Sequence, residues 1–283
     1  MRYSHVIMSF VICSVHANQK KEIERSKQII DRIKEVSVGM FAGVAQVVVD
    51  QPLLYKKNAT QLHASMEKKR VYQMVRMLYK GGLINASTLG IITAVQLAVA
   101  GGMRNSLFSD PNSAWAHISA TYVGGFVSGV LSGPAEYMIL HKQNFNKTDF
   151  SFATALKSSH HGMLAACLRD GGFAAFCFGL TSVIKVHMTT RDQEVVKGVY
   201  AGSIAGVLST GVTHPFDTIK THLQNEGHLR TKKSTWAKGV ELYKRGGIQE
   251  LYKGCVWRGM RVISGTIIMS IIYDMSKKYT YIS

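Results

Sequence analysis

Three prolines at a near-constant interval constrain this 283-residue chain more than any other feature. Pro52, Pro134 and Pro215 lie 82 and 81 residues apart, with a glycine nine residues before each and a glutamine nine residues after each. Self-similarity at a fixed period indicates one supersecondary unit used three times. A proline inside a long helix removes one backbone hydrogen bond and kinks the helix. The matched residues are Gly43, Gly125 and Gly206 before the prolines, and Gln61, Gln143 and Gln224 after them.

Long uncharged stretches accompany the repeat. Charged residues make up only 18% of the chain, against roughly 25% in soluble domains. Beyond residue 35, six runs of 12 residues or more lack Asp, Glu, Lys and Arg, and two of them exceed 20 residues, which is enough to cross a hydrocarbon core of about 30 Å. We expect three pairs of transmembrane helices, while a soluble all-α bundle with unusually apolar helices is the alternative. The runs are Val36–Val49, Gly81–Met103, Pro111–Ala135, Gly171–Ile184, Gly198–Phe216 and Val262–Tyr273.

Small residues spaced four apart precede the prolines. Such pairs let helix backbones approach closely in a membrane, so we expect tight helix contacts there. The pairs are Gly39 with Gly43, Gly125 with Gly129, and Gly202 with Gly206.

The repeat resembles the mitochondrial carrier family, whose signature Px[DE]xx[KR]…Q ends each odd-numbered helix. Residues 215–224 match it fully, whereas the first repeat has Leu54 in place of the acid and the second has Ile139 in place of the base. The resemblance covers residues 36–279 and implies six transmembrane helices in three pseudo-threefold repeats, with short matrix-side helices. The implied parts are a tail over 1–35 with an amphipathic segment, and repeats over 36–107, 111–188 and 197–279.

In that family, the acid of one odd helix pairs with the base of the next and closes the matrix side. The two departures from the signature fall on the two ends of one expected bridge, Leu54 with Ile139, which leaves an apolar contact in place of an unpaired charge. We therefore expect a working matrix gate, and degeneration in an inactive relative is the alternative. Its expected members are Lys57 with Asp217, Glu136 with Lys220, and the bracing glutamines Gln61, Gln143 and Gln224.

The family's second signature, [FY][DE]xx[KR], is complete only at the end of the last helix. One acid, Asp274, is shared among three bases, so at most one ion pair can close the cytoplasmic gate. We expect that side to open easily. The bases are Arg104, Lys185 and Lys277.

The resemblance places the substrate site on the even helices. An arginine can hold a carboxylate or phosphate through two hydrogen bonds, and Asp170 could take a cationic group of the same molecule. Arg258, three residues before Arg261, could support it. The expected substrate is amino-acid-like or otherwise zwitterionic; a nucleotide carrier and a non-transporting scaffold are the alternatives. Structural ion pairing of Arg169 and helix packing by Thr88 are alternative roles for those two residues. The expected substrate-binding residues are Thr88, Arg169, Asp170 and Arg261.

The sequence also bears on catalysis, metal binding, lipid binding and the N-terminal stretch. No catalytic dyad, nucleophile or phosphate loop is evident, so we expect no enzyme, and the histidines lack the spacing of metal ligands. Gly81 and Gly254 resemble the family's cardiolipin-binding turns. Residues 6–15 resemble a short signal peptide, with a chance apolar tail as the alternative.

The net charge of +17 fits a membrane topology. The loops 62–80, 144–161 and 225–253 hold 14 bases and 5 acids, whereas 104–113 and 185–197 hold 4 and 3. Positive loops stay on the matrix side, which places both termini on the intermembrane-space side. Nucleic acid is not needed to explain the charge. We expect a monomeric, multi-pass exchanger of the mitochondrial inner membrane that contacts lipid and a small-molecule substrate and works by alternating access.

Overall fold

The computed structural model describes residues 41, 43–63, 71–110, 113–143, 160, 162–188, 194–226 and 233–280. The chain divides into two units, Met1–Phe41 and Ala42–Ser283, and all but one of the described residues belong to the second. The expected amphipathic segment and signal-like stretch lie outside the described residues.

The regular structure of the described residues is helical. One helix covers residues 43–61 and contains Pro52. The other two repeat prolines also lie inside helices, Pro134 in α4 and Pro215 in α8. The remaining bounds are α2 (Val71–Leu78), α3 (Gly82–Leu107), α4 (Ala114–Gln143), α6 (Met163–Ala174), η1 (Ala175–Gly179), α7 (Leu180–His187), α8 (Glu194–Glu226), α9 (Thr235–Leu251) and α10 (Cys255–Thr280).

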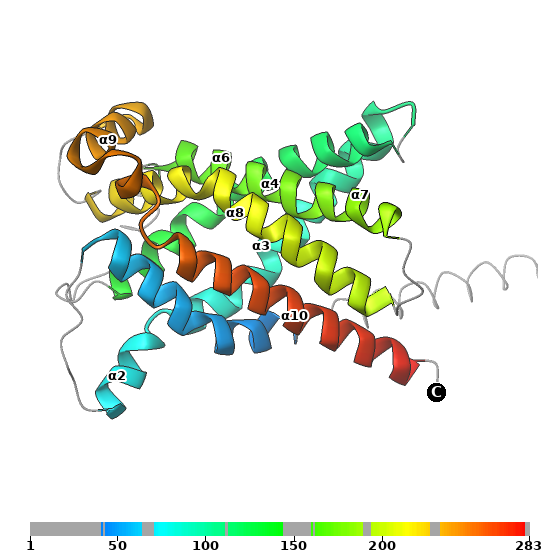
Figure 1. Ribbon diagram of the computed structural model, residues 1–283, viewed down its shortest axis with the longest axis horizontal. Helices are drawn as coiled ribbons and strands as arrows, with labels where there is room; N and C mark the ends of the chain where they lie inside the picture. Colours follow the sequence, from blue (N-terminus) through cyan, green and yellow to red (C-terminus); the bar gives the residue numbers. More distant parts are fainter. Residues whose placement is uncertain are drawn as a thin grey trace, which may run out of the picture. The chain divides into compact units, whose positions relative to one another are not determined.

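Within the described part of the chain, six long segments pack against one another in a closed order. Helix α4 contacts α3 and α6, and α8 contacts α6, α7 and α10. The helix over 43–61 completes the order, because Gln51 accepts a hydrogen bond from Asn85 of α3 and Asp50 accepts one from Ser264 of α10. This helix, blue in Figure 1, lies beside α10. The short helices α2 and α9 each connect an odd segment to the following even one.

The glycine pairs lie where the two long helices of one repeat touch. A Cβ on Gly129 of α4 would stand 2.6 Å from the Cα of Cys167 in α6, and one on Gly202 of α8 would stand 2.7 Å from the Thr266 side chain in α10. Gly43 faces Leu89 of α3 at an ordinary contact distance. Close approach was predicted at these positions and is confirmed for the second and third repeats.

Each kinked helix leaves a carbonyl without its usual donor, four residues before the proline. In two repeats a tyrosine hydroxyl from the following segment supplies it. Tyr79 donates to the carbonyl of Val48 at 2.8 Å, and Tyr252 donates to that of Gly211 at 3.0 Å. In these two repeats, the tyrosine that precedes α3 or α10 therefore satisfies the carbonyl that the proline leaves without a backbone donor.

The fourth long segment is not one regular helix. The uncharged run 171–184 contains a π-helical turn, η1, between α6 and α7. Gly179 ends this turn close to Ile118 of α4, where a Cβ would come within 2.9 Å. A π-turn changes the face that the later residues present, so the sequence register of α6 does not continue into α7.

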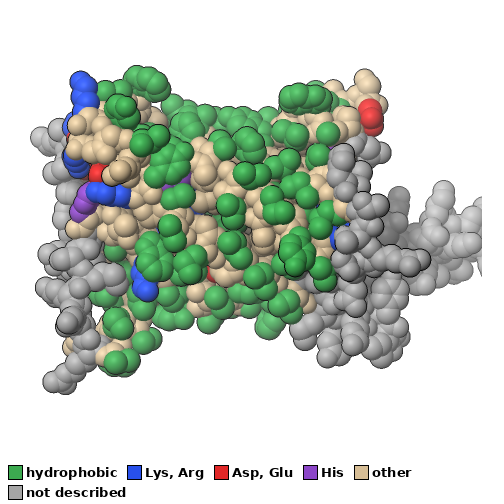
Figure 2. All heavy atoms as spheres, viewed as in Figure 1, with side chains coloured by type: hydrophobic (Ala, Val, Ile, Leu, Met, Phe, Trp, Pro, Cys, Tyr) green, Lys and Arg blue, Asp and Glu red, His purple; other side chains and the backbone are tan. Residues whose placement is uncertain are grey.

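Polar and apolar side chains are distributed in the reverse of a soluble protein. The described residues include buried Lys57, Arg169 and Asp217, while Ile204 of α8 and Val256 of α10 are exposed. Figure 2 shows hydrophobic side chains over the middle of the displayed face, with most of its described charges toward the two ends. Two stretches, Val71–Leu107 and Ala114–Gln143, are long and apolar enough to cross a membrane by length and composition. The polar groups buried in the other long helices lower their mean hydropathy.

Candidate functional site: a buried ion-pair cluster

Two ion pairs join the odd helices at the level just after the prolines. The Lys57 ammonium lies 2.8 Å from the Asp217 carboxylate, and the Lys220 ammonium contacts Glu136. Both pairings were predicted from the repeat. Leu54 and Ile139, at the third position, are both buried, as expected for an apolar substitute.

Helix periodicity explains how α8 forms ion pairs with two neighbouring helices. Asp217 and Lys220 are three residues apart, so they share one face of α8. From that face the acid reaches the helix over 43–61 and the base reaches α4.

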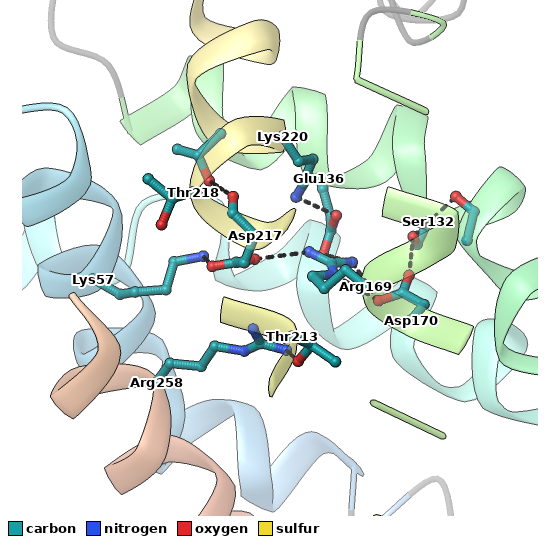
Figure 3. A network of polar contacts seen from close by, with 12 residues as sticks. Lys57, Ser132, Glu136, Arg169, Asp170, Thr213, Asp217, Thr218, Lys220 and Arg258 are labelled. Atoms are coloured by element: carbon teal, nitrogen blue, oxygen red, sulfur yellow. Dashed lines mark hydrogen bonds and ion pairs between the residues drawn. The ribbon is translucent and has the colours of Figure 1, made fainter. Parts of the chain in front are cut away.

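Arg169 of α6 connects the two pairs into one ion-pair cluster (Figure 3). Its guanidinium lies 2.9 Å from Glu136, 3.1 Å from Asp217 and 2.6 Å from Asp170. The second oxygen of Asp170 accepts a hydrogen bond from Ser132 of α4 at 2.8 Å. We use the name ion-pair cluster for Lys57, Glu136, Arg169, Asp170, Asp217 and Lys220.

This arrangement corrects one expectation about Arg169. Neighbours on a helix seldom face each other, so helix geometry alone does not predict pairing of Arg169 with the adjacent Asp170. The long guanidinium nevertheless folds back, and both Nε and Nη2 contact the Asp170 carboxylate. The arginine is 6% exposed, so in this conformation it is a buried partner of structural ion pairs.

The glutamines contact neighbouring segments, but only one reaches a predicted ion pair. Gln61 donates to Asp217 at 3.0 Å and to Thr218 at 3.2 Å. Gln143 accepts from Asn58 at 2.5 Å, beside the apolar third position. Gln224 donates to the backbone carbonyl of Gly133 at 3.4 Å, so it braces α4 and not the Lys220 pair itself.

The other expected substrate residues do not join the cluster directly. The Thr88 hydroxyl donates to the Ile84 carbonyl at 2.7 Å, which is a bond within its own helix. Arg258 donates to Thr213 at 2.9 Å, below the ion pairs in Figure 3. Arg261, one turn later on α10, has a buried Nε without a hydrogen-bond partner among the described residues.

The residues expected to form a cytoplasmic gate belong to the later parts of the even segments. Arg104 contacts the His117 ring at 3.4 Å, and Lys185 is exposed. The side chains of Asp274 and Lys277 lie outside the described part. Among described residues, no three His, Cys, Asp or Glu side chains form a group that could hold a metal ion.

Three glycines start the even segments in the same left-handed conformation. The φ angles are 82° at Gly81, 78° at Gly162 and 81° at Gly254. A Cβ there would stand 3.2 Å from Ile139, 3.3 Å from the Lys220 carbonyl and 3.1 Å from the Lys57 carbonyl, respectively. Each glycine thus packs beside the base position of the next repeat, and Gly162 of the second repeat does so like the other two.

A smaller charged group ties α9 to the end of the first helix. Glu250 lies 2.6 Å from His63 and 2.6 Å from Lys253. Burial raises the pKa of Glu250, but hydrogen bonds from Lys253 and His63 lower it by more, so the net pKa lies below its ordinary value.

The sequence is similar to that of known mitochondrial carriers and related transporters. The family model for mitochondrial carrier protein matches residues 191–282. A tricarboxylate transporter of Alternaria alternata is 30% identical over 174 residues, which cover 54% of this chain and 81% of that protein.

Two further relatives align over most of the chain. A human mitochondrial tricarboxylate transport protein is 26% identical, with 85% of this chain and 88% of that protein covered. A mitochondrial glycine transporter of Saccharomyces cerevisiae is 25% identical, with coverage of 78% and 83%. Together with the threefold signature and its two ion pairs, these similarities establish that the chain belongs to the mitochondrial carrier family.

Proposed function

We propose that this protein is a solute transporter of the mitochondrial inner membrane that works by alternating access. The observation that carries the proposal is a buried network of charges inside helices whose outer faces are apolar. Charged groups within a membrane are costly, so they face the interior, pair with one another and mark solute pathways. A soluble bundle would place Ile204 and Val256 inside and Lys57 outside. Two relatives of which this chain covers more than 80% are also named as transport proteins, and no feature of the described site favours catalysis.

The proposed topology has six spans in three repeats, over 36–107, 111–188 and 197–279. Basic loops keep α2 and α9 on the matrix side and both termini in the intermembrane space. The left-handed turns at Gly81 and Gly254 precede α3 and α10, whose first N–H groups could receive the phosphate of a bound lipid such as cardiolipin. We treat the carrier as a monomer.

The ion-pair cluster would act as the matrix gate. Arg169 holds Glu136 and Asp217 together, and each of these acids also holds a lysine of another helix. An anionic group of the substrate would compete for Arg169, release both acids and weaken the gate. Substrate binding and gate opening would thus share one side chain, and a ligand can shift the equilibrium only by such differential contacts.

For the substrate we propose an amino-acid-like or other zwitterionic metabolite bound by Thr88, Arg169, Asp170 and Arg261. An acid and several arginines on the even segments favour a solute carrying both charges. A tricarboxylate is the second candidate, favoured by the names of two relatives and by the excess of arginine on α10.

Uptake into liposomes tests the proposal. Purified protein is assayed with labelled amino acids, carnitine, di- and tricarboxylates and nucleotides. Arg169→Ala and Arg261→Ala should each reduce uptake at least tenfold, whereas Arg245→Ala, on the exposed part of α9, should leave it unchanged. A folded wild-type protein that transports none of these solutes would favour the scaffold alternative. Nucleotide uptake alone would overturn the substrate class.

A further inference from the structure

Buried polar atoms without hydrogen-bond partners among the described residues occur on both the first helix and α10. Asp50 is 1% exposed, and its Oδ1 accepts the Ser264 hydroxyl at 2.5 Å, while its Oδ2 has no hydrogen-bond partner among the described residues. Nη1 of Arg258 and Nε of Arg261 are likewise buried and unpartnered. An unsatisfied buried polar atom is costly, so a group of them on two facing helices calls for a ligand.

These groups share one side of α10. Arg258, Arg261 and Ser264 follow at intervals of three residues, which places them along one face of the helix. The Ser264 contact shows that this face meets the helix over 43–61, and Arg261 attracts the Asp50 carboxylate electrostatically. The Gln46 side chain lies beside Gly265 together with the Asp50 carboxylate, because a Cβ on that glycine would collide with Gln46 Nε2 and stand 3.3 Å from Oδ2 of Asp50.

The carboxylate of Asp170 differs from that of Asp50 because both of its oxygens have partners. One of its oxygens is held by Arg169, and the other accepts the Ser132 hydroxyl. An ammonium group brings three donors and needs free acceptors. In this conformation Oδ2 of Asp50 accepts no hydrogen bond from the described residues, and Arg261 is the arginine that attracts this carboxylate, whereas both oxygens of Asp170 have partners.

We propose that Asp50 binds the cationic group of a zwitterionic solute whose carboxylate is held by Arg258 and Arg261. This inference rests on the proposed transport function. It replaces Asp170 of the site proposed above by Asp50 on the first helix as the group that recognises the cation, and it adds Arg258 to Arg261 for the carboxylate. A guanidinium can hold a carboxylate through two hydrogen bonds, and the opposed acid then sets which solutes fit. A dicarboxylate in the same place would bring a second negative charge against Asp50.

The experiment compares solute selectivity in liposomes. Wild type, Asp50→Asn and Asp170→Asn are each assayed with the amino acids and carnitine used above. Each is also assayed with a matched carboxylic acid that lacks the cationic group. Asp50→Asn should lower uptake of the zwitterion about 10- to 100-fold, the usual effect of losing a charged hydrogen bond, and should lower uptake of the matched acid much less. Asp170→Asn should lower both alike, because it disturbs the cluster around Arg169.

Two further variants guard against misfolding. Ser264→Ala removes the hydroxyl partner and keeps the charge, and Asp50→Glu moves the charge by one methylene group. Thermal unfolding reports the integrity of each, and the ratio of KM for the zwitterion to KM for the matched acid reports recognition. Both variants should raise this ratio, which a merely structural role would leave unchanged.

The outcomes separate the two proposals. Zwitterion uptake by wild type with an unchanged KM ratio in all Asp50 and Ser264 variants would overturn the role of Asp50 and leave the carrier function standing. Uptake of purely anionic solutes only would do the same. Absence of any uptake would contradict the proposed function itself.

Discussion

Individual charges in the ion-pair cluster are balanced, three acids against three bases, and several have more than one partner. This balance explains how four of the six ionisable side chains can be buried and two, Glu136 and Asp170, partly buried, since an unpaired charge there would be strongly destabilising. The repeat predicted two of the pairs because their partners occur at fixed positions after the prolines. It could not predict the contact between Arg169 and Asp170, because the path of a long side chain depends on its surroundings.

Exchanging the charges of one pair should therefore give an incomplete rescue. Asp217→Lys alone places a third base beside Lys57 and Arg169 and should cost about 3–5 kcal/mol, as for other broken buried pairs. Adding Lys57→Asp restores the pair but leaves the new ammonium facing Arg169. We expect partial recovery of the unfolding temperature and of uptake. Full recovery would mean that the Arg169 contact contributes nothing, and no recovery would mean that the pair is unimportant.

The charges around Glu250 predict a pH dependence at the end of the first helix. A carboxyl with a lower pKa in the folded than in the unfolded protein stabilises the fold above its unfolded pKa, and that contribution is lost as pH falls through the folded pKa. Burial and the bonds from Lys253 and His63 leave the folded pKa of Glu250 below its ordinary value of 4.5. Glu250→Gln should thus lower the unfolding temperature at pH 7, and the difference from wild type should shrink as pH falls below about 4.5. A difference that stayed constant down to pH 3 would contradict this account.

At the scale of the helix, each proline kink depends on a donor from another segment. Tyr79→Phe and Tyr252→Phe remove the hydroxyls that reach the carbonyls of Val48 and Gly211. Each should cost about 1–3 kcal/mol, because little water is present at the lipid-facing side of a span to replace the donor. Tyr243→Phe, at an exposed position on α9, is the matched control and should have no effect. Thermal unfolding in detergent micelles and in nanodiscs compares the three, with the larger losses expected in nanodiscs. Equal effects at all three positions would disprove the role of the kinks.

Helix packing gives a second comparison between matched glycines. A Cβ on Gly129 would collide with the Cys167 backbone, whereas one on Gly211 meets nothing within 4 Å. Gly129→Ala should destabilise the protein by about 1–3 kcal/mol through overpacking, or more if α6 cannot shift. Gly211→Ala should be neutral or should stabilise α8 by up to about 1 kcal/mol, because alanine favours the helix. Unfolding temperatures of the two variants decide the point, and a stable Gly129→Ala protein would refute the close approach.

At the scale of the whole molecule, the sequence predicted the repeat and the helix pairs better than it predicted the polar interior. The prolines and small residues recur at a fixed period, so their contacts could be inferred one repeat from another. Asp50 could not be found in this way, because it precedes the proline and has no charged counterpart at the equivalent positions Ser132 and Thr213. The π-turn η1 left no periodic signal either, since it depends on how α6 packs against α4.

The proposed topology predicts that α9 and the end of α3 lie on opposite sides of the membrane. Trp236 of α9 and Leu107 at the end of α3 are exposed and belong to the basic and the nearly neutral sets of loops, respectively. Trp236→Cys and Leu107→Cys are introduced singly into a protein whose four native cysteines have been replaced by alanine. In mitochondria with a ruptured outer membrane, an impermeant maleimide should label the Leu107→Cys protein. The Trp236→Cys protein should react only after the inner membrane is made permeable, because an excess of positive charge keeps α9 on the matrix side. The reverse pattern would invert the orientation. Simultaneous labelling of both proteins would contradict the span between these two residues, since only a membrane crossing along α3 and its neighbours separates their chemical accessibility.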